Sequence, residues 1–398
     1  MSTIVSISTA PGIGGIGIIR MSGEKSFEIL DKIFKPKTSQ KIEDIKGYTI
    51  KYGHIVENNE IIDEVLVSYF KAPRSYTTEN MCEINSHGGN VVVKKILEIC
   101  LKNGANLAEP GEFTKRAFLN GRIDLAQAES VIDVINAKSD KEAKSGIKQL
   151  EGYLSKEIKG IKQEILDVLV NIEVTIDYPE YDTPEVQEKE IAQMLESVGK
   201  KLKKLEKSFD NGKIIKDGIK TAIIGKPNAG KSSLLNAILK EDRAIVTDIA
   251  GTTRDTIEEF VTINGIPLNL VDTAGIREAS DEVEKIGVEK SIKQANDADL
   301  IIAIFDSSKD LEEEDIEILN LIKGKKSIIL LNKSDLNSKI NENDDRFTSI
   351  TENILRISAL NKYGIDELYE KIAELFNLNE INLDNEILIT NIRHKNII

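Results

Sequence analysis

The chain contains only two cysteines, three histidines and no tryptophan. Two cysteines, Cys82 and Cys100, cannot form a disulfide framework or a four-cysteine zinc site, so we expect a reducing compartment and, by default, the cytoplasm. The histidines His54, His87 and His394 show no ligand spacing typical of a metal site. We therefore interpret His87 as structural or ligand-proximal rather than as a catalytic base or metal ligand.

The sequence also lacks any long apolar run. No stretch approaches the roughly 18 apolar residues of a membrane span, and residues 1–8 do not resemble an export signal. We expect a soluble protein without a membrane partner. The 67 acidic residues exceed the 53 Lys and Arg residues, and the net charge of −14 excludes a protein that coats nucleic acid over its whole surface, so any RNA contact must be local.

The length of 398 residues predicts two or three domains. The first 120 residues combine a helical stretch at 91–103 with short β-rich runs at 3–7, 16–20 and 65–70, which is typical of an α+β domain. Gly12, Gly14 and Gly17 match a dinucleotide fingerprint. A β-like run follows where that fingerprint needs a helix, so we interpret the segment as a turn.

Apolar residues recur at steps of three or four in the next hundred residues, the spacing of an amphipathic helix. The first stripe predicts one long helix that Pro179 ends, and it consists of Ile147, Leu150, Leu154, Ile158, Ile161, Ile165, Leu169 and Ile172. A second stripe runs over 191–209. Its lysine cluster at 200–204 could contact nucleic acid, but a solvated helix face is the favoured interpretation.

After residue 212, apolar strands alternate with helical segments, which predicts a parallel sheet. These strands are expected at 221–224, 268–271, 300–305 and 327–331. The first leads into residues 225–232, which have the spacing of a phosphate-binding P-loop. Backbone N–H groups of such a loop surround a phosphate, while Lys231 reaches the β- and γ-phosphates and the Ser232 hydroxyl can ligate Mg²⁺.

Three further motifs follow in the order of a guanine-nucleotide domain. Asp272 can hold Mg²⁺ through water, and the Gly275 N–H can sense the γ-phosphate. The Asp335 carboxylate can accept hydrogen bonds from the guanine N1–H and amine, which selects GTP over ATP. The backbone N–H of Ala359 is expected to meet guanine O6.

Aspartates at strand ends also serve ordinary turn or cap chemistry, but four motifs in this order favour a nucleotide site. The predicted GTP-binding residues are Asn228, Ala229, Gly230, Lys231, Ser232, Ser233, Thr247, Asp248, Ile249, Ala250, Gly251, Thr252, Thr253, Asp272, Thr273, Ala274, Gly275, Asn332, Lys333, Asp335, Ser358, Ala359 and Leu360. Ile276 stands where Ras-type enzymes carry a water-orienting Gln, so catalysis must come from the loop 247–255 or the acidic segment 281–284.

With these motifs, the chain resembles members of the tRNA-modifying GTPase family known as MnmE or TrmE. The resemblance rests on segments spread along the chain, at 12–20, 82–89, 110–120, 124–129 and 278–284. It implies a multidomain α/β protein with an N-terminal α+β domain that binds folate and dimerises, at 1–120. It further implies a helical domain at 121–214 and 379–398, and an inserted Ras-like P-loop GTPase domain with a mostly parallel sheet, at 215–378.

The resemblance implies a GTPase that is activated when two G domains pair around K⁺, which stands where others use an arginine finger. On that basis Thr253 joins Ser232 on Mg²⁺, and Glu284 is catalytic because it orients the attacking water. The implied K⁺ ligands are Asn228, Thr247, Ile249 and Thr252.

For the N-terminal domain, the resemblance implies a homodimer that binds 5-formyltetrahydrofolate through Arg20, Glu83 and Arg122. A carboxylate suits the donor edge of a pterin, and guanidinium groups suit the acidic tail of a folate. The alternatives are a structural ion pair between Arg20 and Glu83, and a helix N-terminal charge for Arg122.

The implied activity is completed by a partner resembling MnmG, which carries FAD, in a heterotetramer. Together they add carboxymethylaminomethyl or aminomethyl groups at C5 of the wobble uridine, position 34, of tRNA. Family members continue past residue 395 to a terminal Cys-x-Gly-Lys, so we expect a C-terminally truncated member whose apolar stripes lack part of their packing partner. The alternatives are an Era-like GTP-dependent RNA or ribosome assembly switch, and an inactive dimerising fragment.

Overall fold

The computed structural model describes residues 2–37, 47–177, 184–239, 244–245, 259–270, 295–379 and 388–398. Contacts within the chain divide it into two units, Met1–Ile132 and Asp133–Ile398, and each is described by itself.

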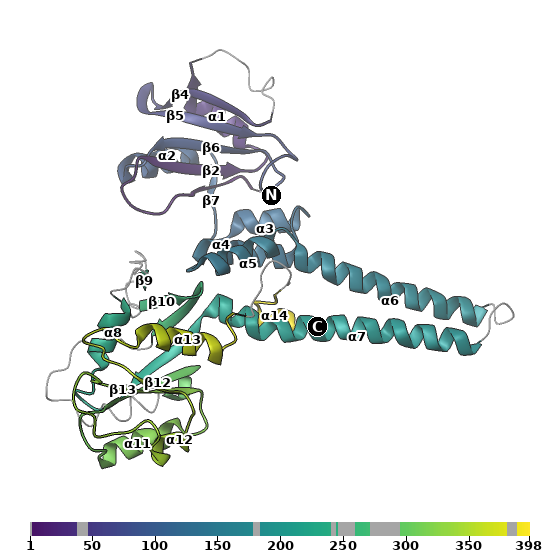
Figure 1. Ribbon diagram of the computed structural model, residues 1–398. Coiled ribbons are helices and arrows are strands. Elements are labelled where there is room, and N and C mark those ends of the chain that lie inside the picture. Colours follow the sequence, from purple (N-terminus) through teal and green to yellow (C-terminus); the bar gives the residue numbers. More distant parts are fainter. Residues whose placement is uncertain are drawn as a thin grey trace. The chain divides into compact units, whose positions relative to one another are not determined.

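The first unit contains a seven-stranded sheet in the order β3-β4-β5-β6-β2-β1-β7 (Figure 1). Neighbouring strands are antiparallel, except that β1 and β7 are parallel. The strands are β1 Ile4–Ile7, β2 Ile16–Ser22, β3 Phe34–Pro36, β4 Thr49–Glu57, β5 Glu60–Phe70, β6 Met81–His87 and β7 Asn106–Leu107. The three strands predicted in this part of the sequence are confirmed.

Two helices, α1 Ser26–Ile33 and α2 Asn90–Lys102, cover one face of this sheet. Their buried apolar residues pack with Ile19, Val67 and Ile84 of the strands in one core. This is the packing expected of a sheet whose strands alternate apolar and polar residues. Both cysteines are buried, as part of the same core. Helices α3 Glu112–Leu119 and α4 Leu125–Asn136 follow along the chain.

The glycine-rich segment before β2 is a turn, as predicted. The Gly14 N–H donates to the Gly88 carbonyl over 3.2 Å. A Cβ at Gly88 would lie 2.4 Å from the Gly14 carbonyl oxygen, so the two segments could not approach this closely with a larger residue. Since β2 follows instead of a helix, the segment does not form a dinucleotide-binding element.

The second unit begins with helices α5 Asp140–Leu150, α6 Tyr153–Asp177 and α7 Pro184–Asp217. The prediction of one helix through residues 147–172 is wrong, because the chain breaks between α5 and α6 at Gly152, whose φ is +79°. Such a left-handed residue is the usual end of a helix, and glycine adopts it without a steric penalty. The predicted second stripe lies within α7.

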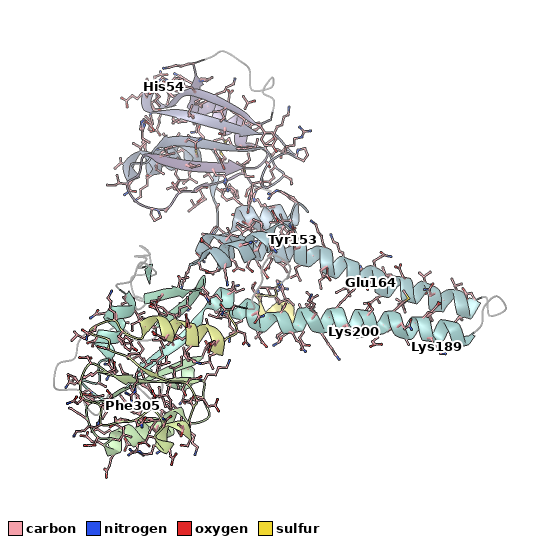
Figure 2. The ribbon with its side chains drawn as sticks, in the orientation of Figure 1. His54, Tyr153, Glu164, Lys189, Lys200 and Phe305 are labelled. Carbon is pink, nitrogen blue, oxygen red and sulfur yellow. The ribbon has the colours of Figure 1, made fainter. Side chains whose placement is uncertain are left out.

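Helices α6 and α7 run side by side where Glu164 and Lys200 are labelled in Figure 2. Lys201 of α7 forms an ion pair with Glu164 of α6. Leu154 and Ile161 of the first stripe are buried, whereas Leu169 is 49% exposed. The stripe is therefore only partly covered. Lys200 is 73% exposed and pairs with Glu196 one turn away, which fits the interpretation of a solvated helix face.

A second seven-stranded sheet has the order β14-β13-β12-β8-β11-β10-β9. Strands β8, β11, β12, β13 and β14 are parallel, and β9 and β10 are antiparallel additions at one edge. The strands are β8 Ile219–Ile224, β9 Ala244–Ile245, β10 Glu259–Ile263, β11 Ile266–Leu270, β12 Leu300–Asp306, β13 Ser327–Asn332 and β14 Ile354–Arg356. The predicted mostly parallel sheet is confirmed.

Helices flank both faces of this sheet, so that its apolar strands are buried on two sides. The helices are α8 Lys231–Leu239, α11 Glu313–Ile322, α12 Asp345–Thr348 and α13 Ile365–Leu375, with the short α14 Ile392–Lys395 near the end of the chain. On one face, Phe305 of β12, which is labelled in Figure 2, packs edge-on against Phe347 of α12. Together with the first unit, this confirms the predicted multidomain α/β class.

Candidate functional site

The loop between β8 and α8 has the form of a phosphate-binding loop. Asn228 and Gly230 have φ values of +62° and +110°, which turn the loop back toward the first residue of α8. A Cβ at Gly225 would lie 2.5 Å from the Ile304 carbonyl oxygen, so β8 and β12 can approach closely here only with glycine. The loop therefore ends at a helix N-terminus, where N–H groups attract an anion.

Lys231 extends back across this loop. Its Nζ donates to the Gly225 carbonyl over 2.5 Å and to the Lys226 carbonyl over 2.8 Å. Burial lowers the pKa of Lys231. The ammonium is thus held at the mouth of the loop by two neutral acceptors, which phosphate oxygens can replace.

Asn332, the last residue of β13, joins three of the predicted motifs. Its Nδ2 donates to the Ala229 carbonyl over 2.8 Å, and its Oδ1 accepts from the Ala359 N–H over 3.0 Å. The side chain is buried against the P-loop, since a Cβ at Gly230 would lie 2.0 Å from Asn332 Nδ2. The P-loop and the segment around Ala359 are therefore parts of one site. The Ala359 N–H, expected to meet guanine O6, is here donated to Asn332.

The predicted base-binding motif, residues 332–335 and 358–360, is held by further hydrogen bonds. Asp335 Oδ1 accepts from the Ser358 hydroxyl over 2.6 Å, and the Ser334 N–H donates to the Ile357 carbonyl. Leu360 is 81% exposed at the rim. The carboxylate of Asp335 is thereby fixed at the carboxyl edge of the parallel sheet, where such folds bind nucleotides.

The remaining predicted residues of this site lie outside the described part of the chain. They are Thr247, Asp248, Ile249, Ala250, Gly251, Thr252, Thr253, Asp272, Thr273, Ala274, Gly275 and Glu284. Of the implied metal ligands, the structure places Ser232 in the first turn of α8 and Asn228 at the exposed tip of the loop. Ser233 follows Ser232 on α8.

Three ion pairs close to the predicted site were not predicted. Lys226 Nζ lies 2.6 Å from Glu312 Oε2 and 2.7 Å from Asp315 Oδ2. Lys333 Nζ lies 2.6 Å from Asp306 Oδ2. The acidic run at 312–315, at the start of α11, is visible in the sequence. Its distance along the chain from the P-loop does not predict that the two segments are in contact.

In the first unit, the guanidinium groups of Arg20 and Arg122 lie over the Tyr76 ring, and Glu83 pairs with Arg20. Arg20 and Glu83 are paired across β2 and β6, with Arg20 Nη2 2.7 Å from Glu83 Oε1. The Arg20 guanidinium lies 5.5 Å from the centre of the Tyr76 ring, and that of Arg122 lies 4.7 Å from it. Arg122 also donates to the Tyr76 carbonyl. The structure thus links these residues through Tyr76 and the Arg20–Glu83 pair, and Tyr76 was not among the residues expected from the sequence.

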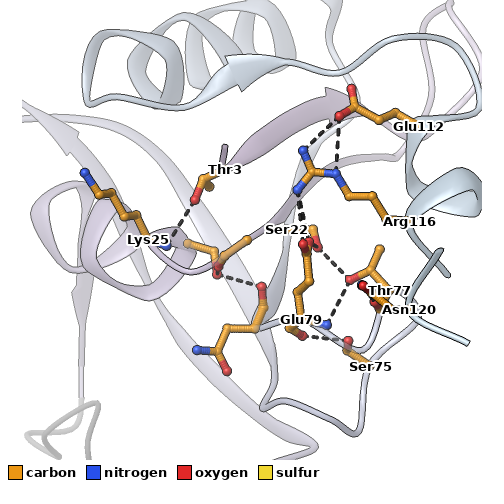
Figure 3. Close-up of polar contacts among 12 residues, drawn as sticks. Thr3, Ser22, Lys25, Ser75, Thr77, Glu79, Glu112, Arg116 and Asn120 are labelled. Atoms are coloured by element: carbon orange, nitrogen blue, oxygen red, sulfur yellow. Dashed lines mark hydrogen bonds and ion pairs between the residues drawn. The ribbon is translucent and has the colours of Figure 1, made fainter. Parts of the chain in front are cut away.

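A buried polar network lies in the same unit (Figure 3). Arg116, whose side chain is 4% exposed, donates to Glu79 and to Glu112. Glu79 also accepts from the Ser22 hydroxyl over 2.8 Å. This network joins α3 to the loop before β6, so the segment at 110–120 contributes structural contacts around Arg116.

His87 is exposed and is bound to Asp63. Its Nδ1 lies 2.7 Å from Asp63 Oδ1, and its backbone N–H donates to Asp63 Oδ2. The hydrogen bond to Asp63 raises the pKa of His87. Among the described residues, no group of three or more His, Cys, Asp or Glu side chains could hold a metal ion. Within the same ranges, no helix is both long and apolar enough to span a membrane.

Two family descriptions match this chain. The family described as "GTP-binding protein TrmE N-terminus" matches residues 3–122, and the one described as "MnmE helical domain" matches residues 125–398. The tRNA modification GTPase MnmE of Clostridioides difficile (strain 630) is 53% identical over 395 residues, which are 99% of this chain and 86% of that relative. The protein with the same description from Alkaliphilus metalliredigens (strain QYMF) is 52% identical over 398 residues, with 99% and 86% covered.

Among solved structures, the G domain of the T. maritima FeoB iron transporter is similar to part of this chain. The likeness covers 39% of this chain and 98% of that one, at 27% identity and a TM-score of 0.30.

Proposed function

The chain belongs to the MnmE family, and from this premise we propose that it is a GTP hydrolase that acts in the modification of tRNA. The observation that carries the proposal is the position of Asn332, which bonds both the P-loop and the segment around Ala359. Phosphate-binding and base-binding motifs that lie far apart in the sequence are thereby parts of one site. A site of this kind fits a guanine nucleotide.

In the proposed complex, the N–H groups of the P-loop and the Lys231 ammonium bind the β- and γ-phosphates. Lys231 exchanges its two carbonyl partners for phosphate oxygens. Asp335 accepts from the guanine N1–H and amine, and adenine cannot make this pair. The Ala359 N–H reaches guanine O6 once it is released by Asn332.

Ser232 fits a role as a Mg²⁺ ligand, because it follows Lys231 at the N-terminal turn of α8. Thr253 is proposed to join it, and a Mg²⁺ ion held by these hydroxyls would offset the negative charge of the phosphates. Asn228 fits a role as a K⁺ ligand, because it is exposed at the loop tip and carries an amide oxygen. Thr247, Ile249 and Thr252 complete the proposed K⁺ set, and Glu284 is proposed to orient the attacking water.

For the N-terminal domain we propose a 5-formyltetrahydrofolate site at Arg20, Glu83 and Arg122. The support is that the guanidinium groups of Arg20 and Arg122 both lie over the Tyr76 ring, while the Glu83 carboxylate pairs with Arg20. This set suits a planar pterin that carries an acidic tail. The direct pairing of Arg20 with Glu83 also fits a structural ion pair, so binding of the folate distinguishes the two.

The finer proposal is that the chain forms a homodimer and works with an MnmG-like partner that carries FAD. Together they add carboxymethylaminomethyl or aminomethyl groups at C5 of uridine 34 in tRNA. The net charge of −14 supports the proposal that the partner makes much of the contact with the tRNA backbone. We propose the cytoplasm as the place of this reaction.

Turnover of GTP at several protein concentrations, in KCl and in NaCl, tests the proposal. We expect turnover to rise both with K⁺ and with protein concentration, because K⁺ is proposed to act between two paired G domains. Turnover that is indifferent to both would contradict the pairing mechanism. An absence of turnover under all conditions, with ATP hydrolysed instead, would contradict the assignment of GTP as substrate.

A further inference from the structure

Two charged side chains meet at the carboxyl edge of the second sheet. Asp306 is the last residue of β12 and lies in register with Asn332, the last residue of β13. Lys333 follows directly, and its Nζ lies 2.6 Å from Asp306 Oδ2. The Asp306 side chain is 10% exposed. The carboxylate is thus largely shielded from water, whereas the Lys333 side chain is 32% exposed. An ion pair with one shielded partner is stronger than a pair at an open surface.

The Asp306 carboxylate is itself fixed in orientation. Its Oδ1 accepts from the Ser308 N–H over 3.0 Å and from the Ser308 hydroxyl over 2.6 Å. Burial alone would raise the pKa of Asp306, but the hydrogen bonds from Lys333 and Ser308 outweigh it and hold that pKa below its usual range. Asp306 therefore remains an anion at neutral pH and presents its other oxygen to Lys333.

The backbone of Lys333 needs such support. Its φ is +63°, in the left-handed region, which a residue other than glycine adopts only when its surroundings hold it there. Asn332 and Asp335 on either side are anchored to Ala359 and Ser358. The side chain of Lys333 is anchored to Asp306, which connects the base-binding motif to the neighbouring strand.

Resting on the proposed function, we propose that Asp306 is a positioning residue for guanine-nucleotide binding. It holds the Lys333 ammonium, and through it the left-handed turn that places Asp335, before the nucleotide arrives. A site that is ordered in advance loses less entropy on binding and holds its ligand longer. Asp306 itself acts through Lys333, so its replacement should alter binding and release of the nucleotide and leave the chemical step unchanged.

The test compares fluorescent GDP binding and release for the full chain and for Asp306→Asn, Lys333→Met and the double variant. Asp306→Asn keeps the shape of the side chain and removes its charge. We expect its affinity for GDP to fall about tenfold, the size of a lost charge-assisted hydrogen bond, mainly through faster release. At saturating GTP, turnover should stay within about twofold of wild type, whereas KM should rise.

The matched control is Asp310→Asn. Asp310 lies in the loop after the same strand and pairs with Lys339 at 3.0 Å, but its side chain is 79% exposed. Its loss should change GDP affinity by less than about twofold, as for an exposed ion pair. A purely structural role for Asp306 would lower the unfolding temperature without changing GDP release, so both are measured.

In the double variant, Asp306→Asn should add less than about twofold to the effect of Lys333→Met, because the two residues act as one unit. Two results overturn the inference. In the first, Asp306→Asn binds GDP with wild-type affinity. In the second, Asp306→Asn lowers GDP affinity as much in the Lys333→Met background as in the wild type. Should Asp306→Asn fail to fold, Asp306→Ser takes its place under the same criteria. Wild-type chain that binds no GDP overturns the proposed function and this inference together, whereas wild-type binding with an unchanged variant overturns this inference alone.

Discussion

The Lys226 ammonium lies 2.7 Å from Asp315 Oδ2 and so ties the second residue of the P-loop to the first turn of α11. The two side chains are 16% and 6% exposed. Asp315 also accepts from the Glu312 N–H, as part of the capping box that begins α11. One contact therefore supports both the phosphate loop and the start of a helix.

Replacing Lys226 with Met should lower the free energy of unfolding by about 2 kcal/mol, because Asp315 is left as a buried carboxylate without its cation. Urea unfolding followed by circular dichroism measures this. The matched control is Lys323→Met at the exposed end of the same helix, with a change within about 0.5 kcal/mol. Equal stabilities for the two variants would show that the Lys226 pair contributes nothing.

The Gly230→Ala variant should lose nucleotide binding, because its new Cβ would lie 2.0 Å from Asn332 Nδ2. Gly324→Ala is the control, because it introduces backbone strain without a steric clash. Gly324 also has a positive φ, of +76°, but its Cβ would meet nothing within 4 Å. We expect Gly324→Ala to lose about 1 kcal/mol of stability with GDP affinity unchanged. Similar GDP affinities for the two alanine variants would contradict the tight packing of Asn332 on the loop.

Glu284→Ala should keep the affinity for GTP and lose turnover, because the proposed role of Glu284 is to orient water rather than to bind the nucleotide. Single-turnover hydrolysis and nucleotide titration separate the two quantities. Glu282→Ala, two residues away, serves as the control and should hydrolyse GTP normally. A Glu284→Ala enzyme with the parental rate would remove this residue from the mechanism.

Arg116→Met should destabilise the first unit by about 3 kcal/mol at neutral pH, because it leaves Glu79 and Glu112 partly buried without their cation. Lys115→Met, at the neighbouring exposed position, is the control. Burial alone would raise the pKa of Glu112, but hydrogen bonds from the Glu109 N–H and Arg116 hold it below its ordinary value of 4.5.

This pKa shift gives the loss a pH dependence. A lowered folded-state pKa contributes stability that is present above 4.5, the ordinary value, and is lost as the pH falls through the folded-state pKa. The difference between Arg116→Met and wild type should therefore shrink in acid, as measured by urea unfolding at several pH values. A difference that stays constant into acid would mean that lost packing, not lost charge pairing, causes the effect.

His87 should titrate above its ordinary pKa of 6.5, because the hydrogen bond to Asp63 stabilises the imidazolium. A raised folded-state pKa gives stability that is full below 6.5 and is lost as the pH rises through the folded-state pKa. Proton NMR of the three histidines measures the pKa directly. Asp63→Asn should return the His87 pKa toward its ordinary value, whereas an unchanged pKa would exclude Asp63 as the cause.

Much of the fold and of the nucleotide site could be predicted from local patterns. The periodicity of apolar residues predicts most strands and helices. Residues 225–232 and 332–335 are predicted as nucleotide-binding motifs because each motif is a short contiguous segment. The helix break at Gly152 was missed, because the apolar stripe continues across it at the same spacing. A glycine in the left-handed conformation can end a helix while the apolar residues on both sides keep the same spacing, so periodicity alone does not predict the break.

The chemistry of the candidate site follows from local sequence: a lysine and a serine at a loop suited to phosphate, and a carboxylate suited to guanine. Which side chains support that chemistry follows from the folding of distant segments onto one another. Lys226 finds Glu312 across 86 positions, and Lys333 finds Asp306 across 27. The reason is physical, since parallel strands bring distant segments to one sheet edge. Which charged groups then pair depends on register and burial, and neither is written in the spacing of a motif.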